Sequence, residues 1–192
     1  MSPRRTGLAG LLLLAVTLLG AGPAVADEVE VKDITFATER DGLELRGAGI
    51  LTYRMVFDVY AAALYLPPGA ASSAVLETDT PKRLELAYRY AIEKEDFARA
   101  AWTVLSEQHE PEVLEALEPS VEELHDAFTA VEPGDRYTLT WKPEAEAPLR
   151  LALNGETRYR GDDPDLARAY FGIWLAAEEP IDAGLRRELL DE

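Results

Sequence analysis

LRGAGILTYRMVFDVYAAALYLP, residues 45–67, carries the strongest secondary-structure signal in the chain. It begins with a small-residue turn, Gly47-Ala48-Gly49, and every odd-numbered position from Met55 to Tyr65 is then apolar or aromatic. An apolar residue at every second position is typical of a strand with one face in a core. We therefore predict a long strand that follows the glycine turn and ends at Pro67-Pro68-Gly69.

The even-numbered face of this strand is mixed. Its first half carries Arg54, Asp58 and Tyr60, and its second half is apolar. A face that is polar at one end and apolar at the other would suit one wall of an amphipathic cleft. A face in contact with solvent would show the same polar half, so both interpretations remain open at this point.

The N-terminal segment has the organisation of a secretory signal peptide. Arg4 and Arg5 precede an apolar run over residues 8–19, and the small-residue triplet Ala24-Val25-Ala26 follows. The apolar run is too short for a comfortable membrane span. We expect cleavage after the triplet, which would leave residues 27–192 as a domain without a membrane span, in the periplasm or secreted.

Composition restricts the partners of this domain. The chain has no cysteine, so its stability depends on packing rather than on disulfides. Residues 27–192 contain 17 basic and 36 acidic residues, a formal charge of −19, which argues against nucleic acid and anionic lipid as partners. The length and the lack of a linker or repeat indicate one domain, and no motif calls for a cofactor.

The rest of the chain divides into strands and helices by the same criteria. We expect strands over residues 28–38 (with a bulge near Asp33), 82–92 and 137–141, and hairpin turns at Asp41-Gly42 and Asn154-Gly155. We expect helices to begin at Glu95, Pro111, Ser120 (with Glu123 as a capping box), Asp163-Pro164 and Pro180. This order predicts the α+β class, with a large antiparallel sheet covered by helices on one face.

Several of these segments resemble the chalcone isomerase-like family, in particular its bacterial secreted members. They are residues 59–67 (VYAAALYLP), the Gly134-Asp135 turn, residues 153–155 (LNG), and residues 169–175 (AYFGIWL) followed by Pro180. The resemblance covers nearly all of the predicted domain. It implies an open-faced sandwich with a ligand cleft between sheet and helices, and it is compatible with chalcone isomerisation, with fatty-acid binding or with no catalysis.

The resemblance also implies candidate ligand-binding residues. True isomerases place a threonine in the long strand and an arginine just after the glycine turn. Here Tyr60 occupies the threonine position, and the nearest arginines are Arg46, before the turn, and Arg54, on the expected face of Tyr60. A tyrosine at this position is similar to the fatty-acid-binding relatives, in which an arginine and a tyrosine hold a carboxylate. The alternative for Arg54 is a surface ion pair with Asp58.

Two further isomerase positions have lost their polar groups. The tyrosine and asparagine that isomerases offer from the helix after the fourth strand resemble Phe97 and Val104 here. Neither side chain can form a hydrogen bond, and losing positioned polar groups costs a large factor in rate. The resemblance therefore favours a binding protein over an isomerase.

Other catalytic and metal chemistry finds little support in the sequence. His109 and His125 are each flanked by acidic residues, but their spacing matches no known metal motif. The aromatic residues Phe171 and Trp174 are expected in the core. No confident catalytic residue and no metal site are predicted.

The leading hypothesis is a secreted or periplasmic, non-catalytic protein that binds a small hydrophobic or amphipathic ligand, such as a fatty acid. Two alternatives remain: an intramolecular lyase of the chalcone–flavanone isomerase type, and a periplasmic protein-interaction module with an unused cleft. Flavanone formation that is lost in Arg46→Ala or Arg54→Ala would favour the lyase, and capture of a partner protein would favour the interaction module.

Overall fold

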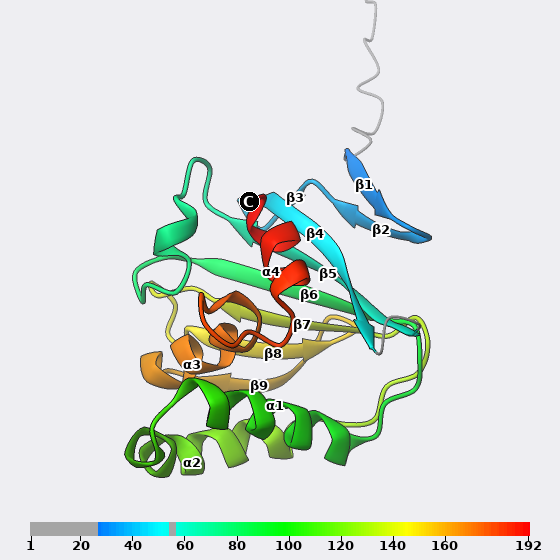
Figure 1. The fold of residues 1–192 in the computed structure, drawn as a ribbon. Coiled ribbons are helices and arrows are strands. Elements are labelled where there is room, and N and C mark those ends of the chain that lie inside the picture. The colour runs from blue at the N-terminus through cyan, green and yellow to red at the C-terminus, as the bar shows by residue number, and fades with distance from the viewer. Residues whose placement is uncertain (1–26, 54–56) are drawn as a thin grey trace, which may run out of the picture.

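A seven-stranded antiparallel sheet forms the centre of the molecule (Figure 1). The computed structural model describes residues 27–53 and 57–192, so the predicted signal peptide lies outside the described residues. Along the sheet the strands follow their order in the sequence: β3 (Glu39–Arg40), β4 (Leu43–Tyr53), β5 (Phe57–Leu66), β6 (Lys82–Tyr88), β7 (Arg136–Trp141), β8 (Leu149–Leu153) and β9 (Glu156–Gly161).

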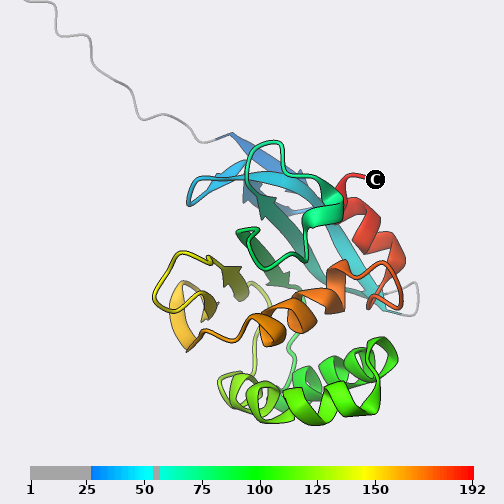
Figure 2. The same ribbon diagram turned by 90° about the vertical axis from the view of Figure 1, so that its left-hand side faces the viewer.

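Helices cover one face of this sheet (Figures 1 and 2). They are α1 (Lys94–Gln108), α2 (Pro111–Asp126), α3 (Pro164–Leu175) and α4 (Ala183–Leu190), with a short 3₁₀ helix at Ser72–Ala74. α3 lies between the sheet and the pair formed by α1 and α2, while α4 packs against β4. The predicted α+β class and the open-faced sandwich with helices over one face are confirmed.

From Tyr60 to Leu66, β5 is buried on both of its faces. The even-numbered side chains from Tyr60 to Leu66 belong to the main core beneath the helices. The odd-numbered side chains from Ala61 to Tyr65 pack with Phe36 in a smaller core on the opposite face. The predicted core face is thus confirmed over these residues, and the face that looked mixed in the sequence belongs to the larger core.

The smaller core is closed by a separate hairpin of β1 (Glu28–Val31) and β2 (Ile34–Ala37). The prediction of one bulged strand over residues 28–38 is therefore wrong. Lys32 adopts a left-handed conformation (φ 58°), and the chain reverses between the paired residues Val31 and Ile34. The break in alternation near Asp33 marks this turn.

The Gly47-Ala48-Gly49 segment is not a turn, because it lies in the middle of β4. β4 continues to Tyr53, which pairs with Phe57 of the antiparallel strand β5. The glycines permit the close approach of α4. A Cβ atom on Gly47 would overlap the carbonyl oxygen of Glu188, and one on Gly49 would overlap the Glu188 carboxylate. The predicted turn is therefore wrong.

α2 is one continuous helix through Pro119 and Ser120, so the predicted capping box at Ser120 is wrong. The Ser120 hydroxyl instead donates to Asp163 Oδ2 (2.9 Å). Asp163 Oδ1 accepts the backbone N–H groups of Asp165 and Leu166, as a helix N-cap does. The predicted start of α3 is confirmed, and its capping residue also ties α2 to α3.

The remaining boundaries follow local backbone chemistry. The turns at Asp41-Gly42 and Asn154-Gly155 are confirmed, and all four residues adopt positive φ angles, as this hairpin type requires. α4 begins after Asp182, whose carboxylate accepts the Leu185 N–H (2.7 Å), rather than at Pro180.

Candidate functional site

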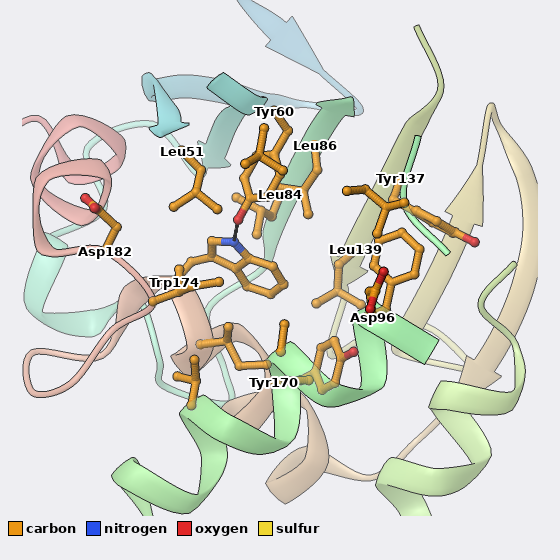
Figure 3. Close-up of a pocket in the computed structure, with 18 of the residues that line it drawn as sticks. Leu51, Tyr60, Leu84, Leu86, Asp96, Tyr137, Leu139, Tyr170, Trp174 and Asp182 are labelled. Atoms are coloured by element: carbon orange, nitrogen blue, oxygen red, sulfur yellow. Dashed lines mark hydrogen bonds between the residues drawn. The ribbon is translucent and has the colours of Figure 1, made fainter. Parts of the chain in front are cut away.

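A cavity of about 860 Å³ lies between the sheet and the helices (Figure 3). Most of its lining side chains are aromatic or aliphatic: Tyr60, Tyr88, Phe97, Phe128, Tyr137, Tyr170 and Trp174, with Leu51, Leu84, Leu86, Val104 and Ile173 among the others. This volume and this lining are typical of sites that hold a small organic molecule.

Tyr60 presents a fixed hydroxyl to this cavity. Trp174 Nε1 on α3 donates a hydrogen bond to the Tyr60 hydroxyl oxygen (2.7 Å; Figure 3). Tyr60 is 5% exposed, and burial raises the pKa of its phenol, so the hydroxyl keeps its proton. No other partner of this hydroxyl occurs among the described residues. The phenolic hydrogen can therefore donate to an oxygen atom of a ligand.

Two further tyrosines add neutral polar groups to the lining. Tyr88 on β6 and Tyr170 on α3 are buried, and burial raises the pKa of both phenols. Neither hydroxyl has a hydrogen-bond partner within residues 27–53 and 57–192. Tyr137 differs, because its hydroxyl donates to the Thr129 carbonyl (3.1 Å). These phenols suit ligand binding better than proton transfer near neutral pH.

The opening of the cavity, here called the mouth, is bordered on one side by exposed residues of α1. Asp96, Arg99, Thr103 and Glu107 recur at the three- and four-residue spacing that places side chains on one helical face. Residues 180–182 lie on the other side. Arg99 is paired with Asp96 (2.6 Å), so the mouth combines one neutralised cation with additional acidic groups.

Residues 23–191 match the sequence profile of a family described as chalcone isomerase-like. This chain belongs to the chalcone isomerase-like family. A search of curated proteins finds no match to its sequence.

A solved structure supports the same fold for this chalcone isomerase-like protein. The crystal structure of a fatty-acid-binding protein from Arabidopsis thaliana matches with a TM-score of 0.65 and 18% sequence identity. The match covers 86% of this chain and 96% of the Arabidopsis chain. At this identity the likeness shows the fold and leaves the activity of this family member open.

Two cavity positions agree with the predicted departure from isomerase chemistry. Phe97 and Val104, which resemble the polar tyrosine and asparagine of true isomerases, both line the cavity. Phe97 stacks on Phe128 (ring centroids 5.1 Å apart) and contacts Tyr137 edge-on. At these two positions the cavity is therefore lined by an aromatic and an aliphatic side chain, neither of which can form a hydrogen bond.

Two of the three predicted ligand-binding residues lie in the described part of the chain, and one of these two lines the cavity. Tyr60 lines the cavity. The Arg46 guanidinium donates to the carbonyl oxygen of Ala70, in the connection between β5 and β6, and Arg46 is not among the lining residues. Arg54 lies outside the described residues, so its part in ligand binding stays a prediction.

The even-numbered spacing predicted that Asp58 shares the cavity face of Tyr60. This prediction is wrong. The pairing of β4 and β5 shifts register between Leu51 and Thr52, which inverts the alternation before Tyr60. Asp58 accepts a hydrogen bond from the Thr52 hydroxyl (2.9 Å) and forms an ion pair with Lys32 of the β1–β2 turn.

Neither histidine belongs to a metal site formed by residues 27–53 and 57–192. His125 is 7% exposed and packs edge-on against Trp102 and Tyr170, rather than lying on the surface. Burial lowers the pKa of His109 and lowers that of His125 to about 4. Within the described ranges, no cluster of three or more His, Cys, Asp or Glu side chains could hold a metal ion.

Sequence reasoning missed Trp174 as a cavity residue. Trp174 and Phe171 were both expected in the core, and Phe171 is fully buried there. Trp174 instead contributes its indole N–H to the Tyr60 hydroxyl inside the cavity. A core residue and a cavity residue give the same helical apolar pattern. The remaining signal in the sequence was that Tyr170 and Trp174 lie four residues apart and so share one helix face. In the structure, this face lies opposite β5 and β6, which carry Tyr60 and Tyr88.

The described part of the chain also contains no helix that is long and apolar enough to cross a membrane.

Proposed function

We propose that this chalcone isomerase-like protein binds a small amphipathic ligand, such as a fatty acid, in the sheet–helix cavity without catalysing a reaction. The observation that carries the proposal is the Tyr60 hydroxyl, which Trp174 fixes as a hydrogen-bond donor inside a largely apolar cavity. An apolar chain would fill the aromatic part of the cavity, and an oxygen atom of the ligand would accept from Tyr60. The fold shared with a fatty-acid-binding protein supports this assignment.

Arg54 completes the proposed site as the partner of a ligand carboxylate. A charge-assisted hydrogen bond would then reinforce the neutral bond from Tyr60. Arg46 is the weaker candidate because its guanidinium already has a carbonyl partner. We further propose that the protein acts in the periplasm or outside the cell, after removal of residues 1–26.

Binding can be tested with residues 27–192 by mass spectrometry of an organic extract and by displacement of a fluorescent fatty acid. Tyr60→Phe should weaken fatty-acid binding about 5- to 10-fold, since one hydrogen bond contributes about 1 kcal/mol. Binding of a neutral apolar naphthylamine probe should change little, because that probe has no oxygen to accept from Tyr60.

Tyr90→Phe is the matched control, because Tyr90 is 48% exposed and does not line the cavity. It should leave both affinities unchanged. If neither a co-purified lipid nor displacement of the fluorescent fatty acid is found, the proposed function is wrong. If Tyr60→Phe weakens the two probes equally, the hydroxyl is not the ligand donor.

A further inference from the structure

Basic side chains cross the outer face of the sheet, on the side away from the cavity. In β7, Tyr137, Leu139 and Trp141 point into the main core, so Thr140 between them faces the other way. Strand register places Thr140 directly opposite Arg83 on β6. It also places Thr140 opposite Arg150 on β8, and Arg150 opposite Arg160 on β9. We call these four residues the basic row.

The two ends of the basic row differ in their charge partners. Arg83 is neutralised, because its guanidinium contacts Glu85 (2.7 Å) and Asp41 (3.1 Å). Arg150 and Arg160 have no carboxylate within 4 Å among the described residues. Like charges directly opposite each other on neighbouring strands destabilise a sheet. In a domain with 36 acidic side chains, two facing arginines that form no ion pair with a described residue point to an anion from outside the chain.

Thr140 provides a second, independent observation. It is 3% exposed, and its hydroxyl is buried without a hydrogen-bond partner in the described part of the chain. A buried hydroxyl that lacks a partner costs about 1–3 kcal/mol in stability, so such groups are uncommon in folded proteins. This one lies between two arginines, where its O–H group could donate to an oxyanion held by Arg150.

We propose that Arg150, Arg160 and Thr140 form a binding site for a phosphate group on the outer face of the sheet. Two guanidinium groups can each bind phosphate oxygens in a bidentate manner, and their combined charge matches that of a phosphate monoester. The site is separate from the cavity and does not depend on the proposed function. Both a soluble phosphate compound and the phosphate head group of a lipid carry the required chemistry.

Inorganic phosphate is the first probe, applied to residues 27–192. Its addition should raise the Tm by about 3 °C near tenfold excess over Kd, relative to sodium chloride of equal ionic strength. Arg160→Gln and Arg150→Gln should each remove most of this shift. Arg187→Gln should keep it, because Arg187 is exposed on α4 and lies away from the basic row. Arg160 is exposed on the edge strand β9, so Arg160→Gln tests the site even if Arg150→Gln folds poorly.

Vesicle flotation distinguishes the two sources of phosphate. If lipid head groups are the ligand, the protein should float with vesicles of phosphatidic acid and phosphatidylcholine, but not with phosphatidylcholine alone, and Arg160→Gln should abolish flotation. A phosphate-dependent Tm shift without flotation would assign the site to a soluble phosphate compound. The proposal is overturned if wild type shows neither response, or if every response survives in both arginine variants.

Discussion

His125 is buried in a part of the helix layer where protonation would be unfavourable. Its ring lies edge-on to Trp102, Phe128 and Tyr170, and its Nε2 atom is buried with no partner among the described residues. Burial is the largest influence on its pKa and lowers it to about 4; nearby Asp126 opposes this effect and Lys94 adds to it. The fold therefore favours the neutral imidazole.

This burial predicts that the free energy of unfolding decreases as pH falls from 7 to 5. In that range the unfolded chain, with a histidine pKa near 6.5, binds a proton that the folded chain excludes, so the loss should be about 2 kcal/mol. Denaturant titrations at pH 7, 6 and 5 measure it. His125→Phe should flatten the dependence and His109→Gln should leave most of it. An equal slope in wild type and His125→Phe would contradict the prediction.

At the scale of single residues, the sequence predicted the chemical character of the site better than the positions of the individual side chains. Tyr60 was identified because strand alternation and family resemblance agree there. Asp58 was misplaced, because a register shift is a property of two paired strands and leaves no mark in the sequence of one. Trp174 was missed as a cavity residue, because an apolar helix face looks the same whether it meets side chains or an open cavity.

At the scale of elements, the contact between β4 and α4 depends on two glycines in different ways. A Cβ on Gly47 would also lie 2.8 Å from the backbone carbonyl oxygen of Leu189. The three atoms nearest to a Cβ on Gly49 all belong to the Glu188 side chain, including its Cβ at 2.8 Å. The overlap at Gly47 involves the backbone of α4, so it can be relieved only if the helix moves. The overlap at Gly49 involves the Glu188 side chain, which can be shortened by mutation.

We therefore predict that Gly47→Ala and Gly49→Ala both lower the free energy of unfolding, by about 2–4 kcal/mol, as overpacking and helix displacement do. Glu188→Ala removes the carboxylate but keeps the Cβ, so it should recover only part of the loss in Gly49→Ala and none in Gly47→Ala. Chemical denaturation of the single and double variants measures both effects. Equal recovery in the two glycine variants would show that α4 approaches β4 differently.

Most elements were predictable because their signals are local. Asp163, Asp41-Gly42 and Asn154-Gly155 fix caps and turns through their own backbone and side chains. The failures at Gly47-Ala48-Gly49 and at Ser120 share another cause. In both, the sequence feature serves a partner that is distant along the chain: α4 in the first and Asp163 in the second. Local pattern alone cannot reveal that partner.

At the scale of the whole molecule, the α+β class and the covered face of the sheet followed from the order of strands and helices. The second core did not follow, because the pattern of β1 and β2 shows strands but not which face of the sheet they cover. The formal charge of −19 over residues 27–192 was evident from composition. The uneven distribution of this charge was not evident from composition. That arginines gather on one face of the sheet is apparent only from the strand register.

This net charge predicts that added salt stabilises the domain. Repulsion among the acidic side chains should weaken as the Debye length falls from about 30 Å at 0.01 M to about 8 Å at 0.15 M salt. The Tm should rise by a few degrees over this range, equally with sodium and potassium chloride, and thermal scans measure it. A Tm that falls with salt would mean that ion pairs outweigh the repulsion.

The contact between α4 and β4 also constrains the order in which the protein can fold. The Ile50 N–H donates to the Glu188 carboxylate across a separation of 138 residues, so β4 gains its helical partner only after almost the entire chain is available. Contacts between distant segments slow folding, because a large loop must close before they form. During synthesis, β4 and β5 would emerge early, and the face of β4 that packs against α4 would stay uncovered until α4 is made. Final closure would then be a post-translational event, and chains that stop short of α4 would remain incomplete and prone to association.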